Sequence, residues 1–201
     1  MRALALTAAI CLGLAGAAIA KDEQPASMSH EDMMKAYAAA AAPGAAHALL
    51  AKSAGHWNAT VKSWQDPAGE PMVSTGTEEA EMIFGGRYLQ SHFRGDMMGQ
   101  PFEGMGTLGY DNGKRKYVGT WFDSMGTGIM SYEGDYDAQK QELVCRGSYV
   151  DPLMGVETKV RLVTRFLSDD AHTFEFWGPA PGTDKEVKWM EMSYSRAVAG
   201  R

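Results

Sequence analysis

The strongest apparent motif in the chain lies in Glu103–Ser124, EGMGTLGYDNGKRKYVGTWFDS. Its first half contains Gly104-x-Gly106-x-x-Gly109, which matches the GxGxxG string of dinucleotide-binding turns. That turn needs a strand before it and a helix after it, because the helix N-terminus holds the pyrophosphate. Here the string is followed by the turn signal DNGK and then by the strand-like Lys116–Asp123. The stretch therefore predicts a β-hairpin and argues against a nucleotide site.

The predicted hairpin carries side chains that could recognise a ligand. Period-two alternation puts Tyr117, Trp121 and Asp123 on one face. An inward Asp123 below Trp121 would suit recognition of a small polar group, with Tyr110 on the facing strand. Alternatively, Asp111 and Asp123 cap turns, which is a favoured role of aspartate.

Soft metal ligands are numerous but scattered. Methionines gather in the middle of the chain and near its end, and with His92 they could bind copper. His92 or His172 could also ligate a haem iron, although the chain has no CxxCH motif. No His, Met and Cys residues cluster at ligand spacing, so adaptable core or pocket lining is the alternative role of the methionines.

Motifs of covalent or metal-assisted catalysis are missing. The chain has no GxSxG, no HExxH and no Walker loop. The neighbouring acids Glu78, Glu79 and Glu81 are interpreted as a solvated strand face and not as an acid–base pair. The sequence thus favours a protein without catalytic activity.

The first residues predict export. Met1–Ala20 has a positive Arg2, a short apolar run over Ala3–Gly16 and the small-x-small site Ala18-Ile19-Ala20, which predicts a secretory signal peptide cleaved after Ala20 and a periplasmic location. No later run is long and apolar enough to predict a membrane span. The net charge of −6 without a basic cluster argues against nucleic acid as a partner. Cys145 would be the one remaining cysteine, so we expect no internal disulfide.

Residues 21–44 are expected to form a polar tail and a helix, and residues 45–201 a single domain. Ser29 can cap a helix over Ser29–Ala42, and a second short helix is predicted over Ala45–Ser53. From residue 55 onward, short alternating runs are separated by Gly, Pro, Asp and Asn. These runs predict strands at His56–Trp64, Thr75–Phe84, Arg87–Arg94, Phe102–Tyr110, Lys116–Asp123, Thr127–Asp137, Glu142–Val150, Val156–Leu167, His172–Trp177 and Glu186–Arg196.

The predicted fold is therefore all-β, with a short helical N-terminal segment before about ten antiparallel strands. Hairpin-length connections without a helical crossover exclude a parallel sheet. A meander of this length can form a sandwich or a barrel. We favour a single barrel of the lipocalin or fatty-acid-binding type, because closure removes exposed strand edges.

Two sets of residues carry a family likeness. Gly55-His56-Trp57 and Arg196 resemble the calycin arrangement, in which a tryptophan of the first strand packs near an arginine of the last, so Trp57 and Arg196 are expected to form a structural cation–π pair. The second set resembles the domain-of-unknown-function family 1579 over roughly Ala45–Arg196, through GGRYL at 85–89, MGQPFEG at 98–104, LGYD at 108–111, WFDSMGTG at 121–128 and YSR at 194–196. This resemblance implies an exported bacterial protein with a lipocalin-like barrel and implies no established activity.

The leading functional hypothesis is binding of a small, mostly apolar ligand inside the barrel. Arg87 and Arg94 flank a strand and could meet a ligand carboxylate, as in fatty-acid-binding barrels, or could be solvated strand ends. The candidate ligand contacts are Arg87, Tyr88, His92, Tyr110, Trp121, Asp123 and Met125. Two alternatives stay open: an enzyme that uses Asp123, Tyr110 and Arg87 at the barrel mouth, and a structural or interaction module of the cell envelope that docks through Ser29–Ser53.

Overall fold

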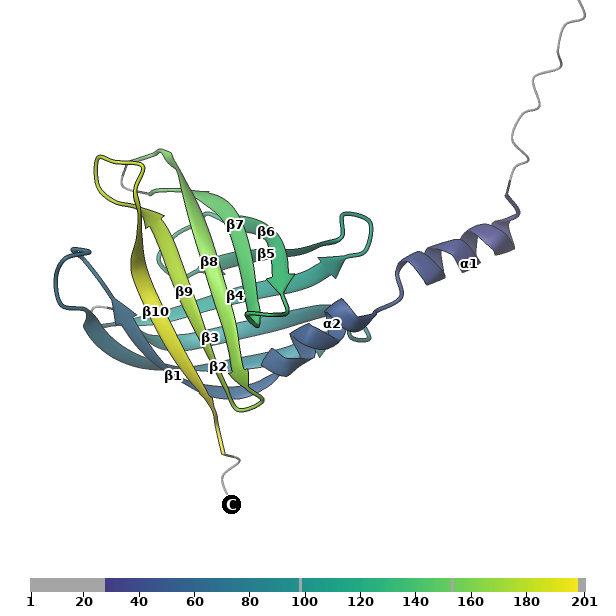
Figure 1. The fold of residues 1–201 in the computed structure, drawn as a ribbon, viewed down its shortest axis with the longest axis horizontal. Helices are drawn as coiled ribbons and strands as arrows, with labels where there is room; N and C mark the ends of the chain where they lie inside the picture. The colour runs from purple at the N-terminus through teal and green to yellow at the C-terminus, as the bar shows by residue number, and fades with distance from the viewer. Residues whose placement is uncertain (1–27, 98, 153, 199–201) are drawn as a thin grey trace, which may run out of the picture.

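Ten antiparallel strands close into a barrel in which each strand pairs with its neighbours in the chain and β1 also pairs with β10 (Figure 1). The computed structural model describes residues 28–198 apart from positions 98 and 153. The strands are β1 Gly55–Ser63, β2 Met72–Ile83, β3 Tyr88–Met97, β4 Gln100–Asp111, β5 Lys116–Asp123, β6 Met130–Asp137, β7 Glu142–Val150, β8 Glu157–Ser168, β9 Ala171–Pro179 and β10 Glu186–Arg196. The predicted all-β meander barrel is confirmed, whereas the predicted signal peptide and the start of the tail lie outside the described residues.

The glycine string belongs to a β-hairpin, as predicted. Gly104, Gly106 and Gly109 lie in β4 and pair with β5. The turn between the two strands forms because Asp111 Oδ1 accepts hydrogen bonds from the backbone N–H groups of Gly113 (2.8 Å) and Lys114 (2.9 Å). No helix follows the string, so it does not form a phosphate-binding turn.

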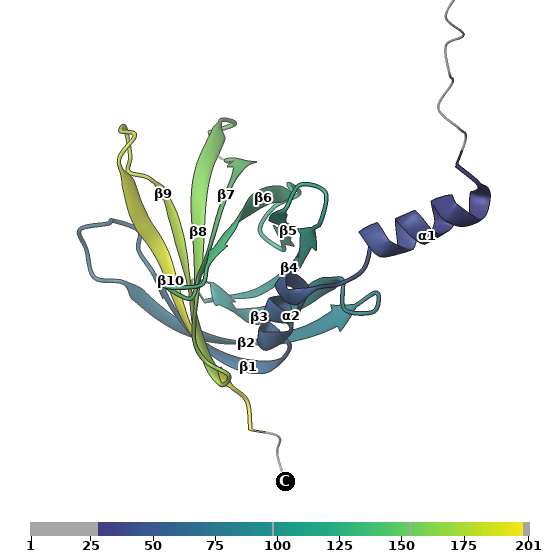
Figure 2. The same cartoon turned by 45° about the vertical axis from the view of Figure 1, so that its right-hand side comes forward.

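In the part of the chain from residue 28 onward, two short helices and a 3₁₀ turn precede the barrel: α1 His30–Ala40, α2 Ala45–Leu50 and η1 Ala51–Ser53. Ser29 caps α1 by accepting a hydrogen bond from the backbone N–H of Asp32 (3.1 Å). Figure 2 shows α1 projecting away from the barrel, and none of its residues is buried. Asn112 holds the C-terminus of α1 by donating from Nδ2 to the carbonyl oxygens of Ala40 and Ala42.

Helix α2 packs against one end of the barrel, which we call the closed end. It contacts β3 and β4, and Leu50 is only 1% exposed. Leu50 belongs to a core that includes Leu89, Tyr117 and Leu143 from three different strands. The opposite end, where β1 ends at Ser63 and β5 ends at Asp123, is called the open end; no described helix packs there (Figures 1 and 2).

Arg196 connects the first and last strands of the barrel at its closed end. Its guanidinium carbon lies 4.1 Å from the ring centroid of Trp57, which is 1% exposed, and the two residues are cross-strand partners. Nη1 donates to the carbonyl oxygen of Ala54 (2.9 Å) and Nη2 to that of Asp169 (2.6 Å). One side chain thus links β1, β10, the β8–β9 turn and the segment after η1.

Arg196→Lys should lower the free energy of unfolding by about 2 kcal/mol, because an ammonium cannot cover the indole ring and donate to several carbonyl groups at once. Urea unfolding followed by tryptophan fluorescence measures the change. The matched control is Arg94→Lys on the outer face, where the side chain is 48% exposed and Nε lies 3.8 Å from Glu103. That variant should stay within about 0.5 kcal/mol of the parent protein. Equal effects of the two substitutions would show that Arg196 is not a structural link.

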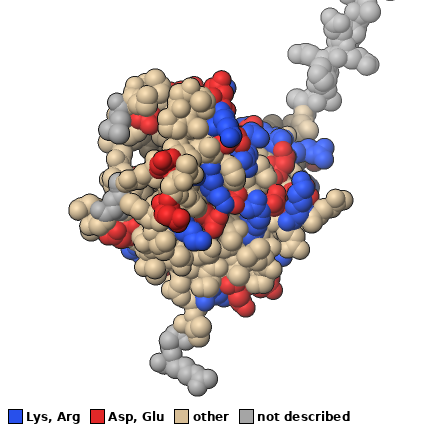
Figure 3. Space-filling view, turned by 60° about the vertical axis from the view of Figure 1, so that its left-hand side comes forward, with Lys and Arg blue, Asp and Glu red and all other residues tan. Residues whose placement is uncertain are grey.

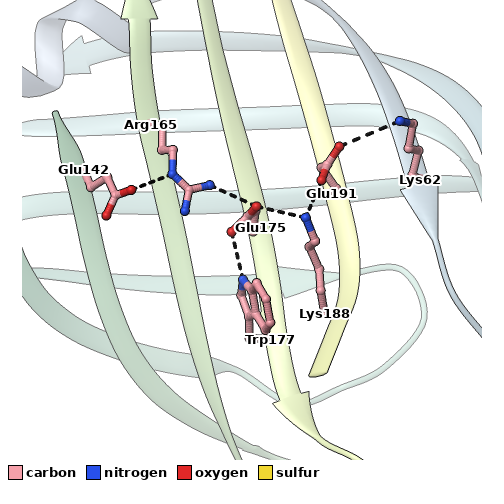
Figure 4. A network of polar contacts seen from close by, with 7 residues as sticks. All are labelled: Lys62, Glu142, Arg165, Glu175, Trp177, Lys188 and Glu191. Carbon is pink, nitrogen blue, oxygen red and sulfur yellow. Dashed lines mark hydrogen bonds and ion pairs between the residues drawn. The ribbon is translucent and has the colours of Figure 1, made fainter. Parts of the chain in front are cut away.

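On the face seen in Figure 3, charges of both signs are interspersed over part of the outer surface. At the centre of one ion-pair network, Glu175 is only 7% exposed and accepts from Arg165 (2.9 Å), Lys188 (3.0 Å) and Trp177 Nε1 (2.9 Å). Figure 4 shows the network continuing to its outer members, Glu142, Glu191 and Lys62. Burial raises the pKa of Glu175, but the three donors together outweigh this effect and leave it below the ordinary value.

Candidate functional site

The inner face of β5 carries Trp121 and Asp123 near the open end. Trp121 Nε1 donates to Asp123 Oδ2 at 2.9 Å, while Asp123 Oδ1 accepts from the backbone N–H of Met125 at 2.9 Å. Asp123 therefore caps the turn after β5, as one of the two alternatives predicted, and also accepts a hydrogen bond from an inward indole. The two residues form a fixed polar edge on an otherwise aromatic wall.

Glycines on the inner wall make room for these rings. A Cβ atom on Gly104 would collide with Trp121, and one on Gly119 would lie 2.5 Å from the ring of Tyr132. Each ring therefore lies directly against the backbone of a neighbouring strand, which only glycine permits. Rings held against the wall in this way do not have to fill the centre of the barrel.

Solvent reaches the inner wall in the open half. Inward side chains there remain half-buried, although the register points them away from the outer surface: Trp121, Met130, Tyr132, Tyr149, Phe176 and Met190. The ring of Tyr132 lies against Gly119 on the neighbouring strand and keeps part of its surface accessible.

Glu78 faces this interior, which corrects its assignment to a solvated strand face. Its cross-strand partners are Trp57 on β1 and Phe93 on β3, and partners share a face. Glu79 does point outward, with a side chain 60% exposed. The sequence contained the signal, because Glu78 has the same parity as Ala80, which is 7% exposed.

Burial raises the pKa of Glu78 to about 7, and the hydrogen bond from Tyr194 Oη to Oε2 (3.4 Å) only partly opposes this effect. Burial also raises the pKa values of Tyr132 and Tyr194, and the nearby charge of Glu78 adds to both shifts. Both phenols are therefore protonated at neutral pH, and Tyr194 donates to a carboxyl whose pKa is about 7. The sequence pattern did not predict that Glu78, Tyr132 and Tyr194 interact in the interior.

Three of the predicted contacts do not line the interior. Tyr88 and His92 lie on the outer face of β3, where Tyr88 packs over Gly109 and His92 Nε2 lies 3.3 Å from Glu103. Arg87 lies in the β2–β3 turn and donates to the carbonyl oxygen of Phe84 (2.9 Å). These positions follow from the parity of β3, whose inward residues are Leu89, Ser91 and Phe93.

The remaining candidates are far apart. Tyr110 lies at the closed end opposite Tyr117, six residues or roughly 20 Å along β5 from Asp123. Met125 lies in the loop after β5 and is 58% exposed. The enzyme hypothesis required Asp123, Tyr110 and Arg87 at one mouth, and the structure does not bring them together. Of the seven candidates, Trp121 and Asp123 form the one pair that shares the inner wall at the open end.

Clefts elsewhere on the molecule have different surroundings. One of about 540 Å³ lies between α2 and the closed end of the barrel, lined by Leu49, Lys52, Tyr110, Arg115 and Tyr136 among others. Another of about 450 Å³ lies largely on the outer face around β5, beside Thr107, Thr120 and Ser131. Neither includes Trp121 or Asp123, although the second is also lined by Tyr132.

His172 is a core residue. Its ring stacks on Tyr194 with centroids 4.3 Å apart and meets Trp57 edge-on at 4.5 Å. Burial lowers its pKa to about 4, with a smaller contribution from the charge of Arg196. Within the part of the chain that the structure describes, no three His, Cys, Asp or Glu side chains are grouped to hold a metal. Burial raises the pKa of the Cys145 thiol to about 12, which makes it a poor nucleophile.

The fold and the inner wall define an up-and-down β-barrel with a solvent-accessible, aromatic and acidic interior. The chain belongs to the family described as "Protein of unknown function (DUF1579)", whose match covers residues 42–196. This membership confirms the resemblance seen in the sequence. A search of curated proteins found no match.

Solved structures share the fold at low sequence identity. Rv2717c from M. tuberculosis is similar with a TM-score of 0.59 and 14% identity, covering 78% of this chain and 100% of that chain. The S-type phycobiliprotein lyase CPES from Guillardia theta has a TM-score of 0.52 and 9% identity, covering 79% of this chain and 100% of that one. Among the described residues, no helix has the length and apolarity needed to cross a membrane.

Glu78→Gln should raise the free energy of unfolding by about 1–3 kcal/mol at pH 8 and much less at pH 4.5. The folded carboxyl has a pKa of about 7 against an ordinary value of 4.5, so the folded state holds an extra proton between these values. The stability linked to that proton is fully present below pH 4.5 and is lost as the pH rises through 7.

Urea unfolding at the two pH values tests this expectation. The control Glu79→Gln changes an exposed outward carboxylate on the same strand and should stay within about 0.5 kcal/mol of the parent at both pH values. A Glu78→Gln variant that is no more stable than the parent at pH 8 would show that the carboxyl is well solvated.

Proposed function

We propose that this protein is an exported barrel that binds a small, mostly apolar ligand through the open end. The observation that carries the proposal is the partial exposure of inward aromatic and methionine side chains in the open half, including Trp121, Tyr132 and Met190. Covering inward apolar surface that is exposed to water lowers the free energy, so it favours binding of an apolar ligand. The closed end, in contrast, is filled by Leu50 and its partners.

The size of this gain is sufficient for useful affinity. A ligand that removes about 250 Å² of apolar surface from water gains roughly 6 kcal/mol before the costs of association. Rings held against glycine backbone, such as Trp121 against Gly104, lose little side-chain freedom on binding. The S-type phycobiliprotein lyase shares the barrel architecture, which is compatible with the proposal.

A neutral fluorophore tests the site directly. N-phenyl-1-naphthylamine should bind the parent protein with a dissociation constant in the micromolar range and with enhanced emission. Thr158→Trp places a large ring on the inner face of β8 near the open end. It should lower the affinity for the fluorophore at least tenfold, because the ring occupies the space of the ligand.

The matched control is Thr60→Trp, which adds the same ring to the exposed outer face of β1 and should leave the affinity within twofold. Circular dichroism establishes that both variants are folded. Equal affinities of the two variants, or no binding by the parent, would contradict an interior site.

Export is supported by the charged start, the short apolar run and the small-x-small site at Ala18–Ala20. Expression of the full chain in a Gram-negative bacterium should yield a periplasmic protein whose first residue is Lys21, as read by intact-mass spectrometry of the osmotic-shock fraction. Replacing Ala18 and Ala20 with Arg should block processing, since the cleavage site needs small residues. Full-length protein confined to the cytoplasm of the parent strain would contradict this location.

A further inference from the structure

Away from the closed end, the charged side chains of the inner wall are acidic. The described strand residues that face inward include the carboxyl groups of Glu78 and Asp123 and a single cationic side chain, Arg196. Arg196 lies beyond Trp57 at the closed end, where it is engaged with the indole and with backbone carbonyls. His172 is neutral in its aromatic stack.

Basic side chains of the strands lie on the other face. Alternation places them outward, where several form ion pairs: Lys62, Arg94, Lys116, Arg146, Lys159, Arg161, Arg165 and Lys188. Arg87 and Arg94, which could have met a ligand carboxylate, both lie outside the interior. An anionic ligand entering the open end would therefore find acids and no cation, which is unfavourable in surroundings with little water.

Glu78 retains capacity to accept hydrogen bonds. Tyr194 is the side-chain donor to it among the described residues, and it reaches only Oε2. A carboxylate has two oxygens and about four acceptor sites, so several remain for a donor on a ligand. Phe93 lies directly across from Glu78, and an aromatic ring beside a carboxylate is a favourable environment for an ammonium group.

We propose that the interior selects apolar ligands that carry an amine or another hydrogen-bond donor, with the donor directed to Glu78, and discriminates against carboxylates such as fatty acids. This inference rests on the ligand-binding function proposed above. The apolar part of the ligand then lies along the open half against Trp121, Tyr132 and Met190. Asp123 at the mouth adds to the attraction of a cation on entry.

Three naphthalenes of nearly equal size separate charge from shape: 1-naphthylmethylamine, 1-naphthalenemethanol and 1-naphthoate. Each competes with N-phenyl-1-naphthylamine for the parent protein at pH 7.5. The amine should displace the fluorophore at a concentration at least tenfold below that of the carboxylate, with the alcohol between them. Glu78→Gln should reduce the ratio of amine to carboxylate affinity at least fivefold, while Glu79→Gln should leave that ratio within twofold.

A second variant makes the test independent of the folding of the first. Asp123→Asn keeps one acceptor, for either Trp121 Nε1 or the Met125 N–H, and removes the charge at the mouth, so it should lower the amine preference by a smaller factor. If the fluorophore binds and the carboxylate displaces it at the same concentration as the amine does, the proposed ligand class is wrong but the proposed binding function stands. An amine preference that survives in folded Glu78→Gln and Asp123→Asn would overturn the assigned residues. If the fluorophore fails to bind the parent protein, both proposals fail.

Discussion

Closure of the barrel between its first and last strands is the constraint on which the rest of the structure depends. β1 and β10 pair over seven positions from Trp57–Arg196 to Ser63–Met190. Without that pairing, β1 and β10 would be exposed edge strands and the inner face of the sheet would no longer be enclosed. Arg196 stabilises the seam at its end, because its guanidinium covers Trp57 and also donates to carbonyls from the segments that precede β1 and β9. A single residue near the C-terminus therefore fixes where the N-terminal helices meet the barrel.

Once the barrel is closed, alternation along each strand sorts side chains by chemistry. The outer face takes nearly all the basic residues and balances them with acids, as in the network around Glu175. Exposed ion pairs contribute little individually, but Glu175 is buried beneath its partners and holds three donors, so this network ties β8, β9 and β10 together. The inner face carries aromatic rings and glycines, and some of these rings lie against the backbone of a glycine on the neighbouring strand. The result is a wall on which the inward rings of the open half stay half-buried.

Most of the fold could be predicted because a two-residue period and turn residues are local signals. All ten strands lie where the pattern placed them, and the turn at Asp111 was enough to reject the nucleotide motif. The site was harder, because alternation divides a strand into two faces without saying which one is inside. On β3 one face has Tyr88 and His92 and the other has Ser91 and Phe93, so both mix polar and aromatic residues. Only pairing with β2 and β4 decides between them, and that information is not local.

The inward orientation of Glu78 is an example of what the local sequence pattern does not reveal. A glutamate among other glutamates is ordinarily solvated, and only closure of the barrel turns it toward Phe93 and Tyr194. An ionised carboxyl in that position costs free energy that a glutamine or a leucine would not. Its pKa near 7 means that this cost is present at neutral pH. Such a cost is offset when a donor or a cation binds beside the carboxyl, because the free energy lost in folding is then regained in binding. The acid that lowers the stability of the barrel at neutral pH is thus the group on which the proposed ligand selectivity depends.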